Sequence, residues 1–380
     1  MSQHFMEKLL DGREVEWKKL GEVINLKRGK RLVKSQLETT GDYAVYQNCM
    51  TPLGYYHEQN VKANTTFIIS AGAAGEIGYS EVDFWAADDV YFLQTPENIE
   101  SKFIYYFLLT QQYKILAQVR RASIPRLSKI VIEKLIIPIP PLKVQSEIVR
   151  ILDNFTELTA ELTAELTAEL SMRKKQYSYY RDTLLSFEEN EVEWKKLGEV
   201  LIRTKGTKIT ATQMKKIHKE NAPLKIFAGG KTIAFVDFND IPEKNINREP
   251  SIIVKSRGVI EFEYYDKPFS HKNEMWSYHS KNKEINIKFI YYFLKINEFY
   301  FQKIASRMQM PQISIPDTDN FKIPIPPLEK QKQIVAILDK FDTLTNSISE
   351  GLPHEIALRQ KQYEYYREML LNFPKPKAEV

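Results

Sequence analysis

The sequence has only one cysteine, no long apolar run and no evident secretory signal, and each of these features limits the class of protein to which the chain can belong. Cys49 has no partner for an internal disulfide, so a reducing cytoplasm is the expected location. We expect its side chain to be a buried small apolar group. No stretch of about 18 uncharged apolar residues occurs, which argues against a membrane-spanning helix. The N-terminal residues contain no apolar run before a cleavage site, which argues against secretion.

The sequence also lacks the motifs of a catalytic or metal site. Residues 229–232 (GGKT) resemble the end of a phosphate-binding loop, but Lys225 stands where that loop needs its first glycine. His271, Glu274 and His279 do not have the spacing of a zinc motif, and no cysteine pair supports one. We expect these three residues to lie on the surface or in a cleft. The chain is therefore predicted to be non-catalytic and to bind no metal or cofactor itself.

A long helix is the central element that the sequence predicts, within residues 137–187. No proline or glycine follows Pro141 there, and leucine recurs every four residues through three TAEL units at 159–170. Leu, Ala and Glu are strong helix formers, and residues four apart lie on one helix face. The prolines of its IPIPPL opening are tolerated only before or in the first turn. The pattern predicts one helix of about 45 residues and about 65–70 Å.

The whole pattern occurs twice. IPIPPL, KFIYYFL and the tyrosine-rich helix end recur at a spacing of 186 residues, and EVEWKKLGEV occurs at both 14–23 and 191–200. Identity over such lengths indicates an internal duplication, and a duplicated chain can form a pseudo-twofold particle. Strand-like segments (TTFIIS and SIIVKS) precede the KFIYYFL helices, which predicts an α+β fold for each globular segment.

The duplication also predicts the domain organisation. We expect two globular domains separated by two long helical regions, each of which carries an apolar seam. The predicted boundaries are 1–141 for the first domain, 142–187 for the central helix, 188–327 for the second domain, 328–373 for the second helical region and 374–380 for a tail. The predicted seam residues are Ile148, Ile151, Leu152, Phe155, Leu158 and Leu162 in one helix, and Ile334, Ile337, Leu338, Phe341, Leu344 and Ile348 in the other.

Two further features of the helical regions affect their expected role. The chain has a net charge of +5, but both helical regions are close to neutral and most of the excess lies in the second globular segment. A helix pair that bound DNA along its length would be basic, so these helices are expected to be spacers and docking surfaces. The second region has Pro353 where the first has continuous TAEL, and this proline is expected to kink or interrupt that helix.

The loop after each KFIYYFL helix is a candidate DNA contact. The first loop, 120–127, aligns with 306–313, and a proline stands at the same place in both. Arg and Gln are side chains that read base edges or bind phosphates, although the alternative is a solvated connector. The predicted contact residues in the loops are Arg120, Arg121, Arg126, Arg307, Gln309 and Gln312, and those elsewhere are Arg28, Lys30, Arg31, Lys205, Lys208 and Arg257.

The duplicated pattern, IPIPPL–xxQ–IVxILDxF–TAEL–RxKQYxYYRxxLLxF, resembles the specificity subunit of type I restriction–modification enzymes. It is most similar to the subgroup with TAEL repeats in the central helix. The resemblance covers both helical regions, whereas 24–100 and 201–287 match the family only in general layout. It implies that each globular segment is a target-recognition domain that reads one half of a split, asymmetric site in double-stranded DNA.

The resemblance also implies partners. The two helices would pack antiparallel as a spacer and would dock two modification (methyltransferase) subunits, which carry S-adenosylmethionine. Restriction (motor) subunits would bring ATP and Mg²⁺. The chain would thus be the non-catalytic part of a host-defence complex. The residues that we assign to subunit docking are Tyr177, Tyr180, Arg181, Tyr363, Tyr366 and Arg367, although these side chains could instead pack the helix ends together.

Two other classes of function stay open at this point. One is a fused methyltransferase or nuclease that acts alone, and the other is a helical scaffold with no nucleic-acid role. The TAEL repeat likewise has two interpretations: a slipped low-complexity tract, or a ruler that sets the unread spacer. We favour the ruler because one unit would lengthen the helix by about 6 Å and rotate its remaining residues by about 40°.

Overall fold

Helix α5 (Leu142–Leu184) runs through 43 residues without a break and begins directly after Pro141. The single long helix predicted from the TAEL pattern is therefore confirmed. The computed structural model describes residues 2–230, 232–306 and 310–374. Two compact units divide the chain, one comprising the residues up to Leu166 with those from Glu355 onward, the other comprising Thr167–His354. Each unit thus contains one globular domain and segments of both helical regions.

Unit 1 contains a four-stranded sheet, a three-stranded sheet and a separate two-stranded pair. The first has the antiparallel order β2-β8-β5-β6, and the second has the order β4-β3-β7 with β3 and β7 parallel. The strand β1, within EVEWKKLGEV, pairs with β9, within IPIPPL. The strands are β1 (Glu16–Lys19), β2 (Asn25–Arg28), β3 (Tyr43–Tyr46), β4 (Gly54–Tyr56), β5 (Thr65–Ile69), β6 (Ile77–Ser80), β7 (Phe84–Ala86), β8 (Val90–Gln94) and β9 (Ile136–Ile139).

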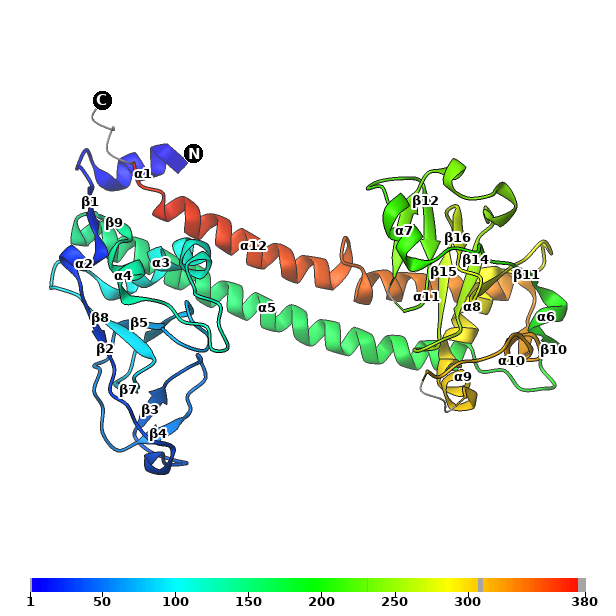
Figure 1. Cartoon of the computed structure of the whole chain (residues 1–380), viewed down its shortest axis with the longest axis horizontal. Helices are drawn as coiled ribbons and strands as arrows, with labels where there is room; N and C mark the ends of the chain where they lie inside the picture. Colours follow the sequence, from blue (N-terminus) through cyan, green and yellow to red (C-terminus); the bar gives the residue numbers. More distant parts are fainter. Residues whose placement is uncertain (1, 231, 307–309, 375–380) are drawn as a thin grey trace. The chain divides into compact units, whose positions relative to one another are not determined.

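The main helix of this domain, α3 (Ser101–Ala117), lies between the four-stranded sheet and the first part of α5 (Figure 1). Its buried Phe103 and Phe107 belong to the same apolar core as Ile148 and Leu152 of α5, because KFIYYFL is apolar on more than one face. The shorter helices are α1 (Ser2–Leu10), α2 (Leu20–Val23) and α4 (Lys129–Glu133), with a 3₁₀ turn η1 at Lys34–Gln36.

Unit 2 repeats this architecture. Its four-stranded sheet has the order β11-β17-β14-β15, its three-stranded sheet has the order β13-β12-β16, and β10 pairs with β18. The strands are β10 (Glu193–Lys196), β11 (Ile202–Thr204), β12 (Leu224–Phe227), β13 (Ile233–Val236), β14 (Ser251–Lys255), β15 (Glu261–Tyr265), β16 (Phe269–His271), β17 (Trp276–His279) and β18 (Lys322–Ile325). The predicted α+β duplication is confirmed in this order of elements.

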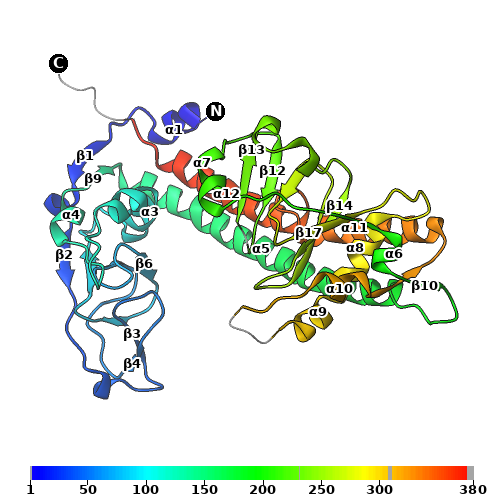
Figure 2. The ribbon, with the colours of Figure 1, turned by 45° about the vertical axis from the view of Figure 1, so that its right-hand side comes forward.

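The segment that begins with KFIYYFL forms one helix in unit 1 and two in unit 2. The segment that begins with KFIYYFL is divided at Asn297, whose side chain donates to Phe293 O at 2.8 Å, whereas α3 is continuous. Figure 2 shows the resulting α8 and α9 on the same domain. The helices are α6 (Leu197–Val200), α7 (Ala211–Ile217), α8 (Ile287–Ile296), α9 (Glu298–Ile304) and α10 (Ile315–Asp319), with 3₁₀ turns η2 (Phe238–Asp240) and η3 (Glu243–Asn245).

In each unit the beginning of one long helical region packs against the end of the other. In unit 1 the ring of Phe155 in α5 stacks on Tyr366 of α12 (Gly351–Leu371), with centroids 5.4 Å apart. In unit 2 the 186-residue equivalents exchange roles, because Tyr180 at the end of α5 stacks on Phe341 of α11 (Leu328–Asn346) at 5.5 Å. In both units the beginning of one helical region therefore lies against the end of the other, which is the predicted antiparallel packing.

The second helical region is interrupted, as predicted, but the break precedes the proline. Helix α11 ends at Asn346, and Pro353 is the third residue of α12, where its missing N–H costs no helical hydrogen bond. Gly351 has a φ of +80°, and a Cβ there would lie 2.5 Å from Thr343 O. The break therefore requires glycine at position 351, and Pro353 lies in the first turn of the next helix.

Several predictions of burial were wrong. Leu158 and Ile337 are 50% and 39% exposed, so they lie outside the seam, and Ile348 is 89% exposed because it falls in the break after α11. Cys49 is only partly buried, and its Sγ donates to Thr51 O at 3.2 Å. His271, expected on a surface or in a cleft, is fully buried in β16. Within the described residues, none of the helices is both long enough and apolar enough to cross a membrane.

Candidate nucleic-acid interface

In unit 1 a pair of backbone hydrogen bonds joins the two ends of the loop that follows α3. Arg120 N donates to Arg126 O at 2.9 Å, and Arg126 N donates back to Arg120 O at 3.1 Å, which closes the loop between them. The loop is also attached to the turn after β5, since Gly72 N donates to Pro125 O at 3.1 Å and Leu127 N donates to Ser70 O at 2.8 Å. Proline locks the backbone φ of this attachment point. The arginines therefore project from a closed, anchored loop.

Unit 2 repeats the same anchoring bonds. Gly258 N donates to Pro311 O at 2.8 Å, Ile313 N donates to Ser256 O at 3.0 Å, and Ser306 N donates to Gln312 O at 3.0 Å. Gly72 and Gly258 both have positive φ, +82° and +77°, which an L side chain rarely adopts. We call this arrangement of loop, glycine turn and proline carbonyl the loop junction. Of the predicted contacts in this loop, Arg307 and Gln309 lie outside the described residues.

The remaining predicted DNA contacts are all solvent exposed. Arg28 is partly engaged, because its Nε donates to Asp88 O at 2.5 Å. Exposure leaves the guanidinium and ammonium groups available to an anionic partner. The exposed residues are Arg120, Arg121, Arg126, Gln312, Arg28, Lys30, Arg31, Lys205, Lys208 and Arg257.

The basic segment after β2 approaches the loop junction through the turn between β7 and β8. Lys30 N donates at 3.0 Å to the carbonyl of Ala86, the last residue of β7, and in the turn that follows Asp89 O accepts a bond from Ser70 N at 2.7 Å. A Cβ on Gly29 would lie 2.2 Å from Ala86 O, so the close approach requires glycine. The structure thus connects Arg28 and Lys30 to the loop of Arg120 and Arg126 through shared backbone, which their separation in sequence did not reveal.

The equivalent segment of unit 2 is held by a buried histidine. Thr207 N, between Lys205 and Lys208, donates to His271 O at 2.7 Å. The His271 ring contacts Lys272 O at 3.0 Å and Thr204 Oγ1 at 3.3 Å. Burial lowers the pKa of His271 below its ordinary value, because the charged imidazolium would lose its hydration. The neutral ring therefore has a structural role in positioning a basic segment.

Next to this segment unit 2 has a hollow of about 450 Å³. It opens between the turn after β12, the turn after β14 and the loop that follows α9. Its cations are not all free, since Lys272 pairs with Glu274 at 2.6 Å. Residues that line it include Gly229, Gly230, Arg257, Gly258, Lys272 and Met310.

The residues assigned to subunit docking make contacts inside the chain. Tyr177 and Tyr180 both stack on Phe341, and Arg181 lies over the Tyr177 ring at 5.9 Å. In unit 1 Tyr366 stacks on Phe155, the Tyr363 hydroxyl accepts a 3.0 Å bond from Thr156, and Arg367 lies over the Tyr363 ring. These contacts match the alternative of helix-end packing. The docking role of these residues stays a prediction.

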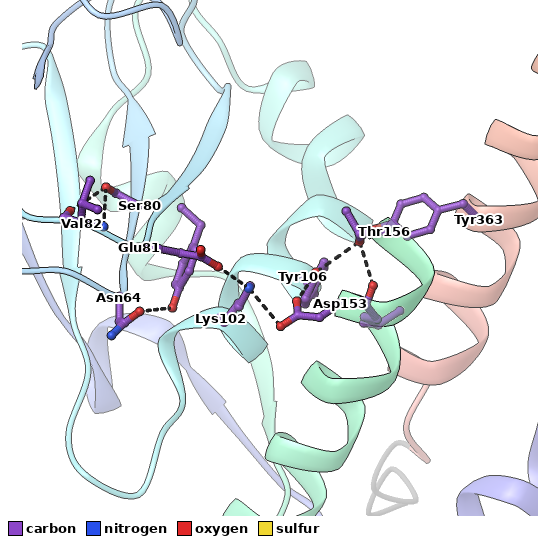
Figure 3. A network of polar contacts seen from close by, with 11 residues as sticks. Asn64, Ser80, Glu81, Val82, Lys102, Tyr106, Asp153, Thr156 and Tyr363 are labelled. Carbon is purple, nitrogen blue, oxygen red and sulfur yellow. Dashed lines mark hydrogen bonds and ion pairs between the residues drawn. The ribbon is translucent and has the colours of Figure 1, made fainter. Parts of the chain in front are cut away.

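A polar network attaches each domain to the start of its own helix. Figure 3 shows Lys102 between Glu81 and Asp153, with Tyr106 and Thr156 beside it. The Tyr106 hydroxyl donates to Asp153 Oδ1 at 2.6 Å. Residues 186 positions later repeat the arrangement: Tyr292 donates to Asp339 Oδ1, and Lys288 pairs with Asp339 Oδ2 at 2.9 Å.

A buried glutamine completes the attachment; it belongs to the duplicated pattern, but no role was predicted for it. Gln145 accepts a bond from Glu100 N at 2.9 Å and donates to Pro140 O at 2.8 Å. Gln331 does the same with Asn286 N and Pro326 O at 2.8 and 2.7 Å. The signal was present in the sequence, because both copies of IPIPPL are followed by a glutamine at the same place. In the described part of the chain, no cluster of His, Cys, Asp or Glu could hold a metal ion.

Comparison with known proteins identifies the duplicated architecture. The family described as type I restriction modification DNA specificity domain matches twice, at residues 13–172 and 189–358. The Escherichia coli type I restriction enzyme EcoR124I/EcoR124II specificity subunit is 37% identical, with 98% of each chain covered. The crystal structure of a type I restriction–modification S subunit from M. genitalium superposes with a TM-score of 0.55 at 20% identity, covering 96% of this chain and 98% of that chain.

A second solved structure has the same fold. It comes from work on complex assembly and conformational transition of the type I restriction–modification system, and it matches with a TM-score of 0.60 at 16% identity over 95% of this chain and 98% of that chain. Each matched region contains one of the two-stranded pairs, β1–β9 or β10–β18. It also contains one globular domain and the start of one long helical region. The chain belongs to the family of type I restriction–modification DNA specificity subunits.

Proposed function

We propose that this chain is the DNA sequence-recognition subunit of a type I restriction–modification complex, and that each domain reads one half of a bipartite, asymmetric site. The observation that carries the proposal is the repeated loop junction, which presents exposed arginine or glutamine side chains from an anchored loop in both units. Arg pairs bidentately with guanine, and Lys and Arg bind phosphates. Because the two loops differ in sequence, the two half-sites are expected to differ as well.

The chemistry is assigned to partner subunits. In this proposal two modification subunits dock on the helical regions and carry S-adenosylmethionine, and restriction subunits bring ATP and Mg²⁺. The cytoplasm, where such a complex meets DNA, is the proposed location. The helix ends support docking only in part, because the tyrosines assigned to docking also pack within the chain. Tyr179 and Tyr365, each next to a stacked tyrosine, are 67% and 63% exposed, and their rings are accessible to a partner.

The TAEL tract is proposed to be a ruler for the unread spacer. It lies in the uninterrupted α5, where Leu162, Leu166 and Leu170 are partly buried and the glutamates of the TAEL units are mostly exposed. Adding or removing one four-residue unit preserves this pattern of faces. It also changes the helix length by about 6 Å and its rotation by about 40°.

The test is a sequence-selection experiment. The purified chain is mixed with its modification subunits and a pool of randomised duplexes, and the bound DNA is sequenced. We expect a motif in two parts separated by a fixed number of unread bases. Absence of any motif would support the scaffold alternative. Methylation or cleavage by the chain alone, with S-adenosylmethionine or Mg²⁺, would support the fused-enzyme alternative.

A further inference from the structure

The two domains share the loop junction but differ at one structural position beside it. In unit 1 this position is Asn48, two residues after β3, and in unit 2 it is Gly229, two residues after β12. The last residues of these strands make the same bond, since Tyr46 O and Phe227 O each accept a backbone N–H at 2.9 Å from the segment after the parallel neighbour strand. The two positions are therefore equivalent in the fold.

Asn48 lies directly against the junction. Its carbonyl oxygen accepts a bond from Ala73 N at 2.8 Å. A Cβ on Gly72 would lie 2.6 Å from Asn48 O and 2.9 Å from Asn48 Cβ. Because Gly72 N binds Pro125 O, the asparagine is one residue away from the loop that carries the exposed arginines. The backbone of Asn48 is thus fixed where the predicted DNA contacts gather.

The side chain of Asn48, in contrast, is exposed and forms no hydrogen bond with any residue that the structure describes. Other asparagines of the domain have structural bonds: Asn60 donates to Ala86 O at 2.8 Å, and Asn64 accepts from the Tyr79 hydroxyl at 3.1 Å. A carboxamide held on a rigid backbone with both its donor and its acceptor free is suited to recognising a ligand that offers the complementary pair.

We propose that Asn48 is a specificity-determining residue of the first domain and that its carboxamide reads the edge of an adenine in the major groove. This inference rests on the proposed function. Adenine presents N7 as acceptor and its N6 amino group as donor, which asparagine matches with two hydrogen bonds. The exposed arginines of the adjacent loop bind neighbouring phosphates or guanines.

The second domain has no equivalent side chain. Gly229 leaves the position empty, a Cβ on Gly258 would meet nothing within 4 Å, and the 450 Å³ hollow occupies the space. Lys272 and the exposed Arg257 line it instead. The two half-sites therefore meet different chemistry at the same place in the fold, an amide in the first domain, and Arg257 with the Lys272–Glu274 ion pair in the second.

The experiment compares N48A, N48D and the matched control N190A, assembled with modification subunits, in selection from randomised duplexes. Asn190 is an exposed asparagine in the segment before β10, outside both loop junctions. We expect N48A to lose the preference for adenine at one position of one half-site, weakening binding to the wild-type site by about five- to 150-fold, the loss of one bidentate base contact. N48D, which lacks the donor–acceptor pair, should lose the same preference and no other.

Several outcomes would overturn the inference. They are an unchanged motif and affinity in both Asn48 variants, an equal loss at every position of both half-sites, or the same change in N190A. Thermal unfolding of each variant establishes that the domain is intact. If the wild-type complex itself selects no motif, the proposed function fails. If it selects a motif that the Asn48 variants retain, only the inference fails.

Discussion

The Tyr106 hydroxyl donates a 2.6 Å hydrogen bond to Asp153, joining α3 of the first domain to the start of α5. Tyr106 is 3% exposed, and burial followed by the bond to Asp153 raises its pKa above the ordinary value for tyrosine. The phenol therefore stays protonated as a donor at neutral pH. Asp153 is also bound by Lys102 at 3.0 Å, so the carboxylate faces two donors from the same helix. This clamp holds the recognition domain on the helix.

We predict that Y106F lowers the free energy of unfolding of unit 1 by about 1.5–3 kcal/mol, the usual cost of losing a hydrogen bond to a charged group. Phenylalanine retains the ring packing, and Lys102 remains paired with Asp153. Chemical denaturation of the purified chain measures the change. Y113F is the matched control, because Tyr113 is 68% exposed, and it should stay within about 0.5 kcal/mol of wild type. Equal effects of the two substitutions would contradict the clamp.

A second prediction concerns the glycines of the two loop junctions. G72A and G258A should each cost about 1–3 kcal/mol, because both force a side chain into the left-handed region. Only at Gly72 does the new Cβ also collide with a neighbour, the Asn48 carbonyl at 2.6 Å. We therefore expect G72A to be the more destabilising and to weaken recognition of the first half-site. Thermal midpoints and duplex binding measure both effects, and equal losses for the two variants would count against this packing.

The sequence was informative where the physics is local or repeated. The helix of α5 follows from its Leu, Ala and Glu spacing, and the duplication follows from identical segments. The sequence was least informative where distant segments meet. Asn48 reaches Gly72 only because β3 pairs in a second sheet, and Ile348 leaves the seam because Gly351 approaches Thr343 O. Such contacts depend on tertiary packing, which overrides local pattern.

The proline was similarly misjudged as the cause of the helix break. Its chemistry excludes a position inside a helix, but it favours the first turn of a new one, which is where Pro353 lies. Exposure of the predicted DNA contacts could be foreseen from their charge. Their connection through the turn at Ala86 and Asp89 could not, since it depends on backbone bonds between β7, β8 and β5.

The third prediction is a dependence on pH in the second domain. The folded pKa of His271 is lowered by burial, so the unfolded chain takes up a proton near pH 6.5 while the folded chain does not. The contribution of the neutral ring to stability is therefore complete above about pH 6.5 and is lost as the pH falls towards the folded pKa. Unfolding of wild type and H271Q at roughly pH 7.5, 6.0 and 5.0, which lie on both sides of the ordinary histidine pKa, compares the two slopes.

We expect wild type to lose more stability than H271Q on acidification, because glutamine keeps a polar contact but does not titrate. The first domain has Ala86 at the equivalent place, since Lys30 N binds Ala86 O as Thr207 N binds His271 O. Acid should therefore loosen the second domain selectively, which hydrogen exchange of the two domains would detect. Parallel stability curves for wild type and H271Q would contradict this role of the buried histidine.

The last prediction tests the ruler. Deleting one TAEL unit from α5 removes about 6 Å of helix, which compares with about 3.4 Å for each base pair of DNA, so the unread spacer should shorten by one or two base pairs. The half-site sequences should stay the same, because neither domain changes. Substituting the four residues of one unit by alanines is the matched control, since it keeps the helix length and its strong helix formers. Motif selection with the assembled complex measures the spacer, and a spacer that stays unchanged after the deletion, or that changes in the alanine control, would favour the slipped-tract interpretation of the repeat.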